Sequence, residues 1–423
     1  MTTIGPASPQ GRPAECSPAT PIGLAALARM AFDGIDMNPL LERLIARVTS
    51  DSQDVASLLD LSTIELLFGR RENGLRLQMQ ALAAERLYRR PPTDAPVAAA
   101  AGGPDGLRLL AFMAPGDFMA NTPLDFLLEG SDVRLDMLYV VPGRPLPAAI
   151  PEHDVAIVAV GESDENREVL GEIARLVAFW PRPVLNRPDR IARLSRDSAW
   201  ALLRNAPGIA MPATARIGRS ALERIGGGEL PVEAIFDGGC AFPIIARPIG
   251  SHAGHGLVKL DDPAAVEAYL RERPEAEFYV SPFIDYSGPD ALFRKYRIAL
   301  IGGRPFASHM AISQHWMIHY LNAGMRESAE KRAEEACFMA EFDTGFARRH
   351  AAALRAVAER TGLEYVAIDC GETRDGDLLI FEIDVAMIVH SMDPPDLFPY
   401  KPPQMRKLFR AFDGMLREAA GRT

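Results

Sequence analysis

Apolar positions follow a helical period through most of residues 21–90. The clearest helices are predicted at 55–69 and 72–90, with a break at Gly69-Arg70-Arg71 and capping side chains at 51–54. A helical solenoid needs roughly three or more such repeats. We therefore interpret residues 21–90 as a helical packing or dimerisation module, with a homodimer or another protein as its possible contact.

From residue 106 the pattern changes to short apolar strands that alternate with helices, up to residue 188. The strands are almost continuously apolar, which is typical of parallel strands covered on both faces. Residues 106–188 are therefore predicted to form a small parallel α/β domain. This domain has no G-x-G-x-x-G motif, so dinucleotide binding there is not supported. The Pro-, Gly- and Ala-rich stretch 91–105 is predicted to be a linker, and residues 1–20 to be disordered.

Farther along the chain, two β-rich runs enclose a glycine-rich loop in the segment FPIIARPIGSHAGHGLVKL. Glycines such as Gly250, Gly254 and Gly256 let backbone amides approach a ligand closely and form an anion-binding nest. A plain glycine-rich hairpin is the alternative. Arg247 before the loop and Lys259 after it favour phosphate binding.

The chain between this loop and residue 362 is predicted to contain a strand EFYVSPFID, a hairpin across Gly302-Gly303 and two helices, at 326–343 and 343–362. Between the hairpin and the helices, His315 and His319 would share a face only in a helix. A zinc site is not favoured because a third ligand is not evident. Their apolar neighbours suit either a substrate wall or a packed core.

The stretch from Glu364 to His390 is predicted to be a β-hairpin with a two-residue turn at Asp375-Gly376. That register places Asp369 opposite Glu382, and strand alternation puts Asp384 on the same face. Carboxylates gathered in this way repel one another unless a cation lies between them, and oxygen ligands suit Mg²⁺ or Mn²⁺. A solvated acidic face on an exposed hairpin is the alternative.

Composition limits the remaining possibilities. The chain has 423 residues and a formal net charge of −10, which argues against general nucleic-acid binding. Its four cysteines have no C-x-x-C spacing and resemble reduced cytosolic thiols. No apolar run is long enough for a membrane span, and no secretory signal is evident. We therefore expect a cytoplasmic protein without membrane or nucleic-acid partners.

The motifs of residues 186–412 resemble, in order and spacing, the ATP-grasp superfamily of ATP-dependent ligases, in the branch that includes glutathione synthetase, D-alanine–D-alanine ligase and the RimK-type glutamate ligases. The resemblance rests on the glycine loop between two strands and on the acidic hairpin AIDC…LLIFEID. It implies an α/β (α+β) fold in which an ATP-grasp domain (189–415) follows a pre-ATP-grasp α/β domain (106–188) and a helical region (21–90).

The resemblance also implies a site that uses ATP and Mg²⁺ or Mn²⁺. The residues implied to hold ATP are Arg247, Ser251, His252, Ala253, Gly254, His255, Gly256, Lys259, Phe283, Ile284 and Asp285. Those implied to hold the metal are Asp369, Glu382 and Asp384. Arg297 and Asn322 are the implied catalytic residues, and His309, His319 and His390 are candidates for the substrate end of the site.

Several positions depart from the family pattern. Arg247 and Ser198 stand where many members have lysine, Ser281-Pro282 replaces a Glu-Glu pair, and Asp384 replaces an asparagine. Arginine holds phosphate through a planar fork rather than a point charge. The implied function is an ATP-dependent carboxylate–amine ligase that acts through an acylphosphate on an amino acid or peptide. A catalytically weakened ATP-binding scaffold or regulatory protein, or a small-molecule kinase on the same fold, is the alternative.

Overall fold

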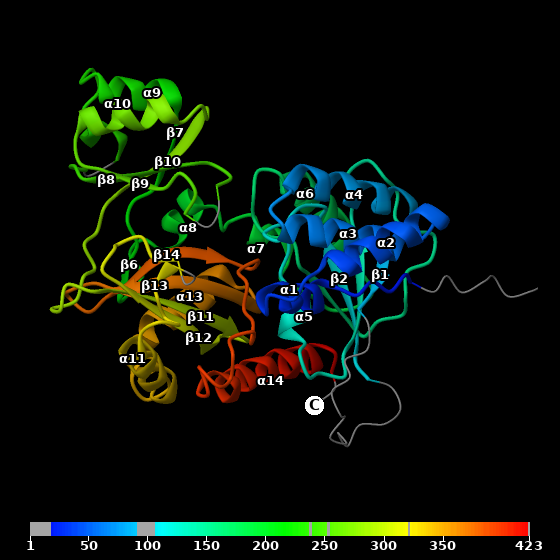
Figure 1. Ribbon diagram of the computed structural model, residues 1–423. Coiled ribbons are helices and arrows are strands. Elements are labelled where there is room, and N and C mark those ends of the chain that lie inside the picture. The colour runs from blue at the N-terminus through cyan, green and yellow to red at the C-terminus, as the bar shows by residue number, and fades with distance from the viewer. Residues whose placement is uncertain (1–17, 91–105, 237–238, 252–253, 320–321, 422–423) are drawn as a thin grey trace, which may run out of the picture.

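The structure is a computed structural model that describes residues 18–90, 106–236, 239–251, 254–319 and 322–421 (Figure 1). The predicted linker at 91–105 and most of the predicted disordered segment at 1–20 lie outside the described residues. The predicted site residues His252 and Ala253 lie outside them as well.

Four helices form the region before the linker: α1 (Leu24–Phe32), α2 (Asn38–Ser50), α3 (Val55–Leu67) and α4 (Arg71–Ala84). The break between the predicted helices lies at Gly69, whose φ of +75° suits glycine. Asp54 caps α3 as expected, since its carboxylate accepts a hydrogen bond from the Ser57 amide at 3.0 Å. Leu27, Leu44 and Ile64 lie in a small core between these helices.

The first sheet has the order β1-β3-β2-β4-β5, and only β1 is antiparallel to its neighbour. Its strands are β1 (Leu87–Arg89), β2 (Arg108–Met113), β3 (Arg134–Tyr139), β4 (Val155–Val158) and β5 (Val184–Leu185), and its helices are α5 (Leu124–Leu127), α6 (Arg167–Val177) and α7 (Pro188–Ile191). The edge strand β1 therefore comes from the region before the linker. Contact of the helical region with a second copy or another protein remains a prediction.

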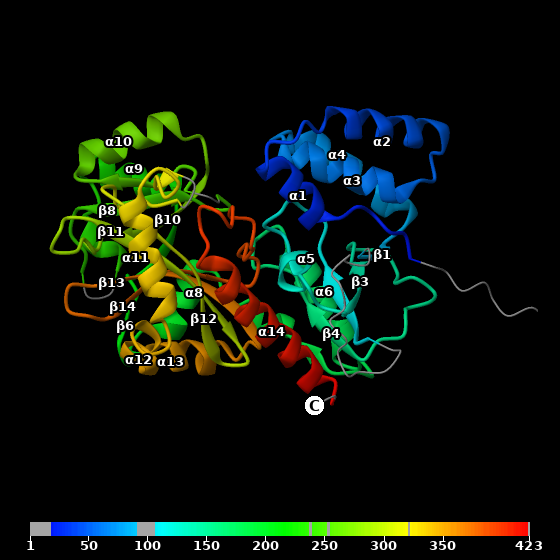
Figure 2. The same cartoon turned by 60° about the horizontal axis from the view of Figure 1, so that its bottom comes forward.

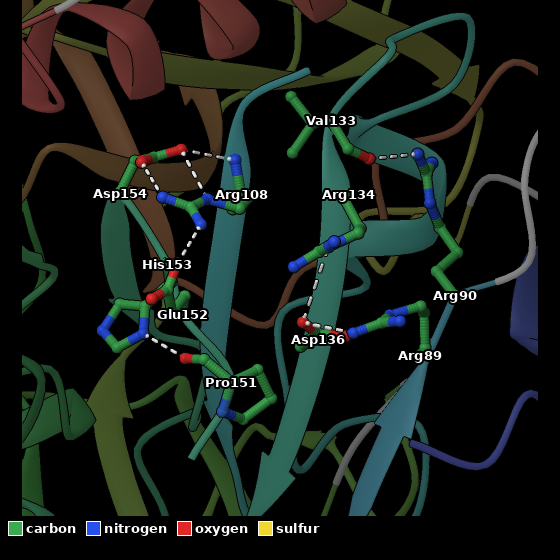
Figure 3. A network of polar contacts seen from close by, with 10 residues as sticks. All are labelled: Arg89, Arg90, Arg108, Val133, Arg134, Asp136, Pro151, Glu152, His153 and Asp154. Atoms are coloured by element: carbon green, nitrogen blue, oxygen red, sulfur yellow. Dashed lines mark hydrogen bonds and ion pairs between the residues drawn. The ribbon is translucent and has the colours of Figure 1, made fainter. Parts of the chain in front are cut away.

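Charged residues fix the amino-terminal ends of these strands (Figure 3). Arg108, the first residue of β2, donates to both oxygens of Asp154, which precedes β4, at 3.3 and 2.8 Å. On the neighbouring strand, buried Asp136 accepts from Arg89 of β1 at 2.6 and 3.1 Å. These ion pairs join β2 to β4 and the end of the antiparallel strand β1 to β3, and leave the opposite, carboxyl edge for other contacts.

The second sheet is antiparallel and has the order β7-β10-β8-β9. Its elements are β7 (Ala215–Gly218), β8 (Ile244–Pro248), β9 (Val258–Leu260), β10 (Glu277–Pro282), α9 (Arg219–Gly226), α10 (Pro263–Glu272) and a short 3₁₀ helix, Val232–Ile235. The two helices lie together on the outer side of this sheet (Figure 1). Leu222, Val266 and Phe278 belong to a core of its own.

The third sheet has the order β12-β11-β13-β14-β6, and only the pairing of β6 is parallel. Its strands are β6 (Ile209–Ala210), β11 (Phe293–Ile301), β12 (Arg304–Ser313), β13 (Tyr365–Glu372) and β14 (Leu378–Asp384). The helices of this part are α8 (Arg196–Leu203), α11 (Ala329–Ala340), α12 (Phe346–Arg349), α13 (Ala351–Thr361) and α14 (Lys401–Ala419).

The two faces of the third sheet have different neighbours. Ile298 and Ile368 face a core that includes Phe346 and Leu354 of α12 and α13. The opposite face carries Ala299, which belongs to a core with residues of α14 and the first sheet. Both views show α14 running from the third sheet toward the first sheet, which together with α5, α6 and α7 forms the first domain (Figures 1 and 2). Side chains alternate between the two faces along each strand, so Arg297 of β11 and Asp369 of β13 lie on the same face as Ala299.

The predicted mixed α/β class is confirmed. The predicted helix 72–90 is wrong at its end, because α4 stops at Ala84 and Leu87–Arg89 pair with β3 as strand β1, and the predicted helix 343–362 is divided into α12 and α13. The long helix α14 was not predicted. No helix in the described ranges is long and apolar enough to cross a membrane.

Candidate functional site

The hairpin formed by β13 and β14 places Asp369 opposite Glu382 and Ala367 opposite Asp384, as predicted. The predicted two-residue turn is wrong. Thr373 donates its amide to the Asp377 carbonyl and Gly376 donates to the Thr373 carbonyl, both at 3.0 Å, so the turn has three residues, and Gly376 takes a φ of +87°.

A second irregularity restores the predicted register. The pairing shifts between Asp369 and Cys370, so that Cys370 faces Ile380 and Phe381 lies between the paired residues as a bulge. The extra turn residue and the bulge compensate for each other. The two acids therefore face each other although the turn that was expected to align them is different.

Asp369 is buried in an ion-pair cluster with two basic residues of β11. Arg297 donates to its two oxygens at 2.7 and 2.9 Å, and the Lys295 ammonium lies 2.9 Å from one of them. Burial alone would raise the pKa of Asp369, but the positive charges of Arg297 and Lys295 outweigh it and hold the pKa well below the ordinary value. Arg297 also donates to the carbonyl of Ile388 at 2.8 Å, which fixes its orientation.

Glu382 lies beside two other arginines. Arg196, the first residue of α8, donates to its carboxylate at 2.6 Å and to the Phe381 carbonyl at 3.1 Å. Burial opposes ionisation, yet Arg196 and Arg247 lower the pKa of Glu382. Burial, with the repulsion of Arg196, in turn lowers the pKa of Arg247 to about 9. The cluster therefore contains four cations around two carboxylates.

Asp384 occupies a different environment. Its carboxylate accepts from the Ala386 amide at 3.0 Å. Burial, aided by the negative charges of Glu382 and Glu162, raises its pKa to about 7. Together with Glu382, it lines a small cavity of about 70 Å³ that also contains Glu162 and Asp164 of the first domain.

The three predicted metal ligands are therefore only partly brought together. Their oxygen donors suit Mg²⁺ or Mn²⁺, and Asp369 and Glu382 line one cleft. Within the described residues, however, no group of three His, Cys, Asp or Glu side chains is placed to hold an ion in this conformation. The donor chemistry fits a divalent cation bound by these two acids together with an anionic ligand.

The cleft itself has a volume of about 380 Å³ and is lined by residues of the second and third sheets. One end carries the four cations Arg196, Arg247, Lys295 and Arg297. The rest is largely apolar, and its wall includes Ile245, Leu257, Phe283, Ile284, Tyr286, Trp316, Ile318 and Ile380. Phe283 and Trp316 meet edge to face, with their ring centroids 5.6 Å apart. A flat apolar group and an attached polyanion would match the two ends.

The glycine loop lies at the cationic end. Arg247 donates to the Ser251 hydroxyl at 3.2 Å, and that hydroxyl donates to the Pro248 carbonyl at 2.7 Å. Gly254 lines the cleft with a φ of +75°, and Gly256 has a φ of +67°. A Cβ on Gly256 would lie 2.7 Å from Pro248 Cδ, so a larger residue does not fit there without movement.

Other predicted nucleotide residues lie at different distances from the cleft. Phe283 and Ile284 line it, whereas Asp285 is exposed and pairs with Arg374 of the hairpin turn at 2.7 Å. Lys259 lies over the Phe283 ring, 4.9 Å from its centroid, and pairs with Asp261. His255 is exposed.

The predicted catalytic and substrate residues are also divided. Asn322 and His319 line the cleft, and the Asn322 amide oxygen accepts from the His319 amide at 3.1 Å. His309 is the strand partner of Arg297 on β12, and burial lowers its pKa well below the ordinary value. His390 does not line the cleft but packs near Phe32 of α1 and Phe126 of α5.

Two basic residues of the cleft were not assigned from the sequence. Lys295 lies two residues before Arg297 on the same strand face, so strand alternation could have identified it. Arg196 begins a helix that lies far from β14 in the chain, and no local pattern connects it with Glu382.

No family model matches this chain. Among solved structures, the chain is similar to a RimK-domain ATP-grasp protein from Sphaerobacter thermophilus (17% identity, 73% of this chain and 99% of that chain, TM-score 0.43). It is also similar to a D-Ala:D-Ser ligase from Enterococcus faecalis (13%, 74% and 100%, TM-score 0.45) and to a D-alanine–D-alanine ligase from Bacillus anthracis complexed with ATP (13%, 74% and 98%, TM-score 0.43). These likenesses are remote, so the function proposed below is supported from this chain's own residues.

Proposed function

We propose that this chain is an ATP-dependent ligase of the ATP-grasp type, which activates a substrate carboxylate as an acylphosphate and transfers the acyl group to an amine. The supporting observation is the cleft between the second and third sheets. It combines an apolar wall with four cations that surround the facing acids Asp369 and Glu382. This combination suits a nucleoside triphosphate, whose base is flat and whose phosphates are anionic.

The nucleotide would lie along the cleft. Phe283, Ile284 and Trp316 offer contact area for the adenine ring. Arg247 and the backbone amides around Gly254 would hold the phosphates, since the left-handed glycines let the loop approach them closely. Asp285 is less suited to the ribose in this conformation because Arg374 already binds it.

Asp369 and Glu382 would hold Mg²⁺ or Mn²⁺, whereas Asp384 lines the neighbouring small cavity together with Glu382. The metal, when bound, supplies charge neutralisation between the phosphate oxygens. Lys295, Arg297 and Arg196 now neutralise these acids. Arrival of a triphosphate would give the same basic side chains a second anionic partner, so they are placed to exchange between carboxylate and phosphate.

Phosphoryl transfer depends mainly on positioning and on charge stabilisation. Arg297 and Lys295 would stabilise the transferred phosphoryl group and the acylphosphate that forms from the substrate carboxylate. Asn322 and His319 lie at the same cleft and would orient the substrate. The substrate is proposed to be a small molecule or a peptide that enters beside the first domain, whose Met119 also lines the cleft.

A second candidate function, an ATP-binding scaffold or regulatory protein of low activity, has one observation in its favour. Both oxygens of Asp369 are already bound by Arg297 and Lys295, so the acid has no free oxygen for a metal in this conformation. A kinase acting on a hydroxyl would use the same site with a different acceptor.

The test is ADP release by the purified chain with ATP, Mg²⁺ and pooled amino acids and short peptides. The ligase proposal predicts release that depends on the pool and is lost in Glu382→Gln. Glu152→Gln, at the exposed amino edge of the first sheet, is the matched control and should retain activity. Saturable ATP binding without any ADP release would instead favour the scaffold function.

A further inference from the structure

A separate cavity lies at the carboxyl edge of the first sheet, where the strands of open α/β sheets commonly present ligand sites. Its volume is about 90 Å³. It is lined by the last residues of β2 and β3, Met113 and Tyr139, and by residues 116–118 and 121–125, which follow β2. The proposed ATP cleft does not supply these residues, so this cavity is a distinct feature of the fold.

The helical region closes the cavity from the other side. Gln78 of α4 exchanges two hydrogen bonds with the backbone of Gly116, donating at 2.9 Å and accepting at 2.7 Å. Arg71 of the same helix pairs with Asp117 at 2.9 Å. Asp60 of α3 is 3% exposed and accepts from the amides of Ile22 and Gly23. Helices α3 and α4, the residues that precede α1 and the sheet edge are thus fixed around one cavity.

Two polar atoms at this cavity lack partners. Within the described part of the chain, Thr122 Oγ1 and Asp125 Oδ1 are buried without a hydrogen-bond partner, and Thr122 is 0% exposed. The other oxygen of Asp125 accepts from the Leu24 amide at 3.0 Å. Buried polar groups are normally satisfied, so two orphaned oxygens on one cavity indicate a missing partner.

The charged residues that line the cavity indicate that the missing partner is a cation. Its described lining contains three carboxylates, Asp60, Asp117 and Asp125, and no lysine, arginine or histidine. Burial raises the pKa of Asp60 to about 6 and also raises that of Asp125, although the charges of Arg47 and Arg90, respectively, oppose these shifts. Met113, Phe118 and Met137 add an apolar wall.

We propose that this cavity binds a small primary ammonium compound with a short alkyl part. The ammonium would donate to Asp125 Oδ1 and Thr122 Oγ1, and the alkyl part would contact the methionine wall. A bound cation stabilises the ionised carboxylates, and an amine has the three donors that this set of acceptors lacks. Occupancy would also fix the segment 116–121, whose Met119 lines the ATP cleft, so the site is placed to influence that cleft.

Methionine methyl groups provide a direct measurement on the full chain. With the methionines labelled by ¹³C at the methyl group, ethylammonium chloride should shift the Met113 and Met137 resonances saturably, whereas sodium chloride at the same ionic strength should not. Met317 and Met387, which line the ATP cleft and not this cavity, serve as internal references. Shifts confined to these references would show binding in the other cleft and overturn the proposal.

Two variants test the assigned acceptors. Thr122→Val keeps the side-chain shape but removes the hydroxyl, and Asp125→Asn replaces the charged acceptor; each should weaken ethylammonium binding about tenfold. Glu129→Gln, a nearby acid that pairs with Arg29 and does not line the cavity, is the matched control. If Asp125→Asn unfolds because the hydrogen bond from the Leu24 amide at the start of α1 is lost, the affinity of Thr122→Val for ethylammonium still tests the proposal.

Unchanged affinity in Thr122→Val and Asp125→Asn, or the absence of any saturable shift of Met113 and Met137, would overturn the proposal. An equal response to ethanol, which has the same alkyl part without charge, would also contradict it. These outcomes are independent of ATP binding, so they do not depend on whether the ligase proposal holds.

Discussion

Arg297 and Asp369 face each other across β11 and β13, and the guanidinium donates to both carboxylate oxygens at 2.7 and 2.9 Å. The pair lies on the face of the third sheet that forms the cleft. Its bidentate geometry holds a buried carboxylate ionised and directs an arginine into the site. A single cross-strand pairing therefore supports both the stability of this sheet and the proposed chemistry.

Replacement of Arg297 by methionine leaves Asp369 buried with Lys295 as its remaining charged partner. We expect the free energy of unfolding to fall by about 3 kcal/mol, because removing one partner of a buried ion pair leaves uncompensated charge. Urea denaturation followed by circular dichroism measures this. Arg304→Met, at the exposed start of β12, is the control and should change stability by less than about 0.5 kcal/mol. Equal losses in the two variants would contradict the role given to the pair.

Two glycines of the loop between β8 and β9 differ in the space around them. Gly250 and Gly256 both have positive φ values, +74° and +67°, but a Cβ would meet nothing within 4 Å at Gly250 and would clash with Pro248 at Gly256. Alanine at either position should cost about 1 kcal/mol of backbone strain. Only Gly256→Ala should also weaken ATP binding, by about tenfold, as measured by calorimetric titration. Equal affinities in the two variants would show that the loop conformation does not contribute.

His390 predicts a pH dependence of stability. Burial lowers its pKa from 6.5 to about 4, and Asp393, which opposes this shift, does not offset it. The unfolded chain therefore binds a proton near pH 6.5 while the folded chain does so only near pH 4. The contribution of His390 to the free energy of unfolding is fully present above pH 6.5. It is lost as the pH falls toward 4, by up to about 1.4 kcal/mol per pH unit.

The variant His390→Asn isolates this contribution, because the asparagine oxygen can still accept from the Met392 amide that now binds His390 at 3.1 Å. The difference in melting temperature between the two proteins should shrink, or change sign, on going from pH 7 to pH 4. Parallel pH profiles would show that His390 does not titrate in this range, and that its contacts with Phe32 and Phe126 leave it solvated.

Asn186 connects the first domain to the third sheet. Its side chain donates to the Tyr365 carbonyl at 2.8 Å and accepts from the Tyr365 amide at 2.9 Å, fully buried. Asn186→Ala should lower the free energy of unfolding by about 2 kcal/mol, since two buried backbone groups lose their partner. Asn205→Ala has a similar positive φ, 65° against 52°, and controls for backbone strain. Equal effects would show that Asn186 contributes through its backbone conformation and not through its hydrogen bonds with Tyr365.

Much of the fold could be predicted because local patterns specify it. Strand alternation predicted β11 to β14. The positions of the glycines predicted the loop between β8 and β9 and the end of α13 at Gly362, whose backbone is left-handed. Helix α14 was missed. The two prolines after Lys401 reduced its resemblance to a helix start, although proline is favoured in the first turn.

The part of the site that depends on strand register could be predicted from the sequence. The pairing of Asp369 with Glu382 follows from the hairpin, but it depended on two offsetting irregularities that the sequence did not indicate. Asp384 and His390 lie close to Glu382 in the sequence and were both assigned to the site. In the structure, Asp384 lines the small cavity and His390 packs near Phe32 and Phe126. Arg196 reaches Glu382 only through tertiary packing, which no periodicity encodes.

The most direct test of the proposed nucleotide cleft is a calorimetric titration of the chain with ATP in the presence of Mg²⁺. One ATP should bind per chain, binding should weaken at least about tenfold in Arg247→Ala, and Glu152→Gln should bind as the parent chain does. Absence of binding heat over a range of temperatures, or an unchanged affinity in Arg247→Ala, would contradict nucleotide binding between the second and third sheets.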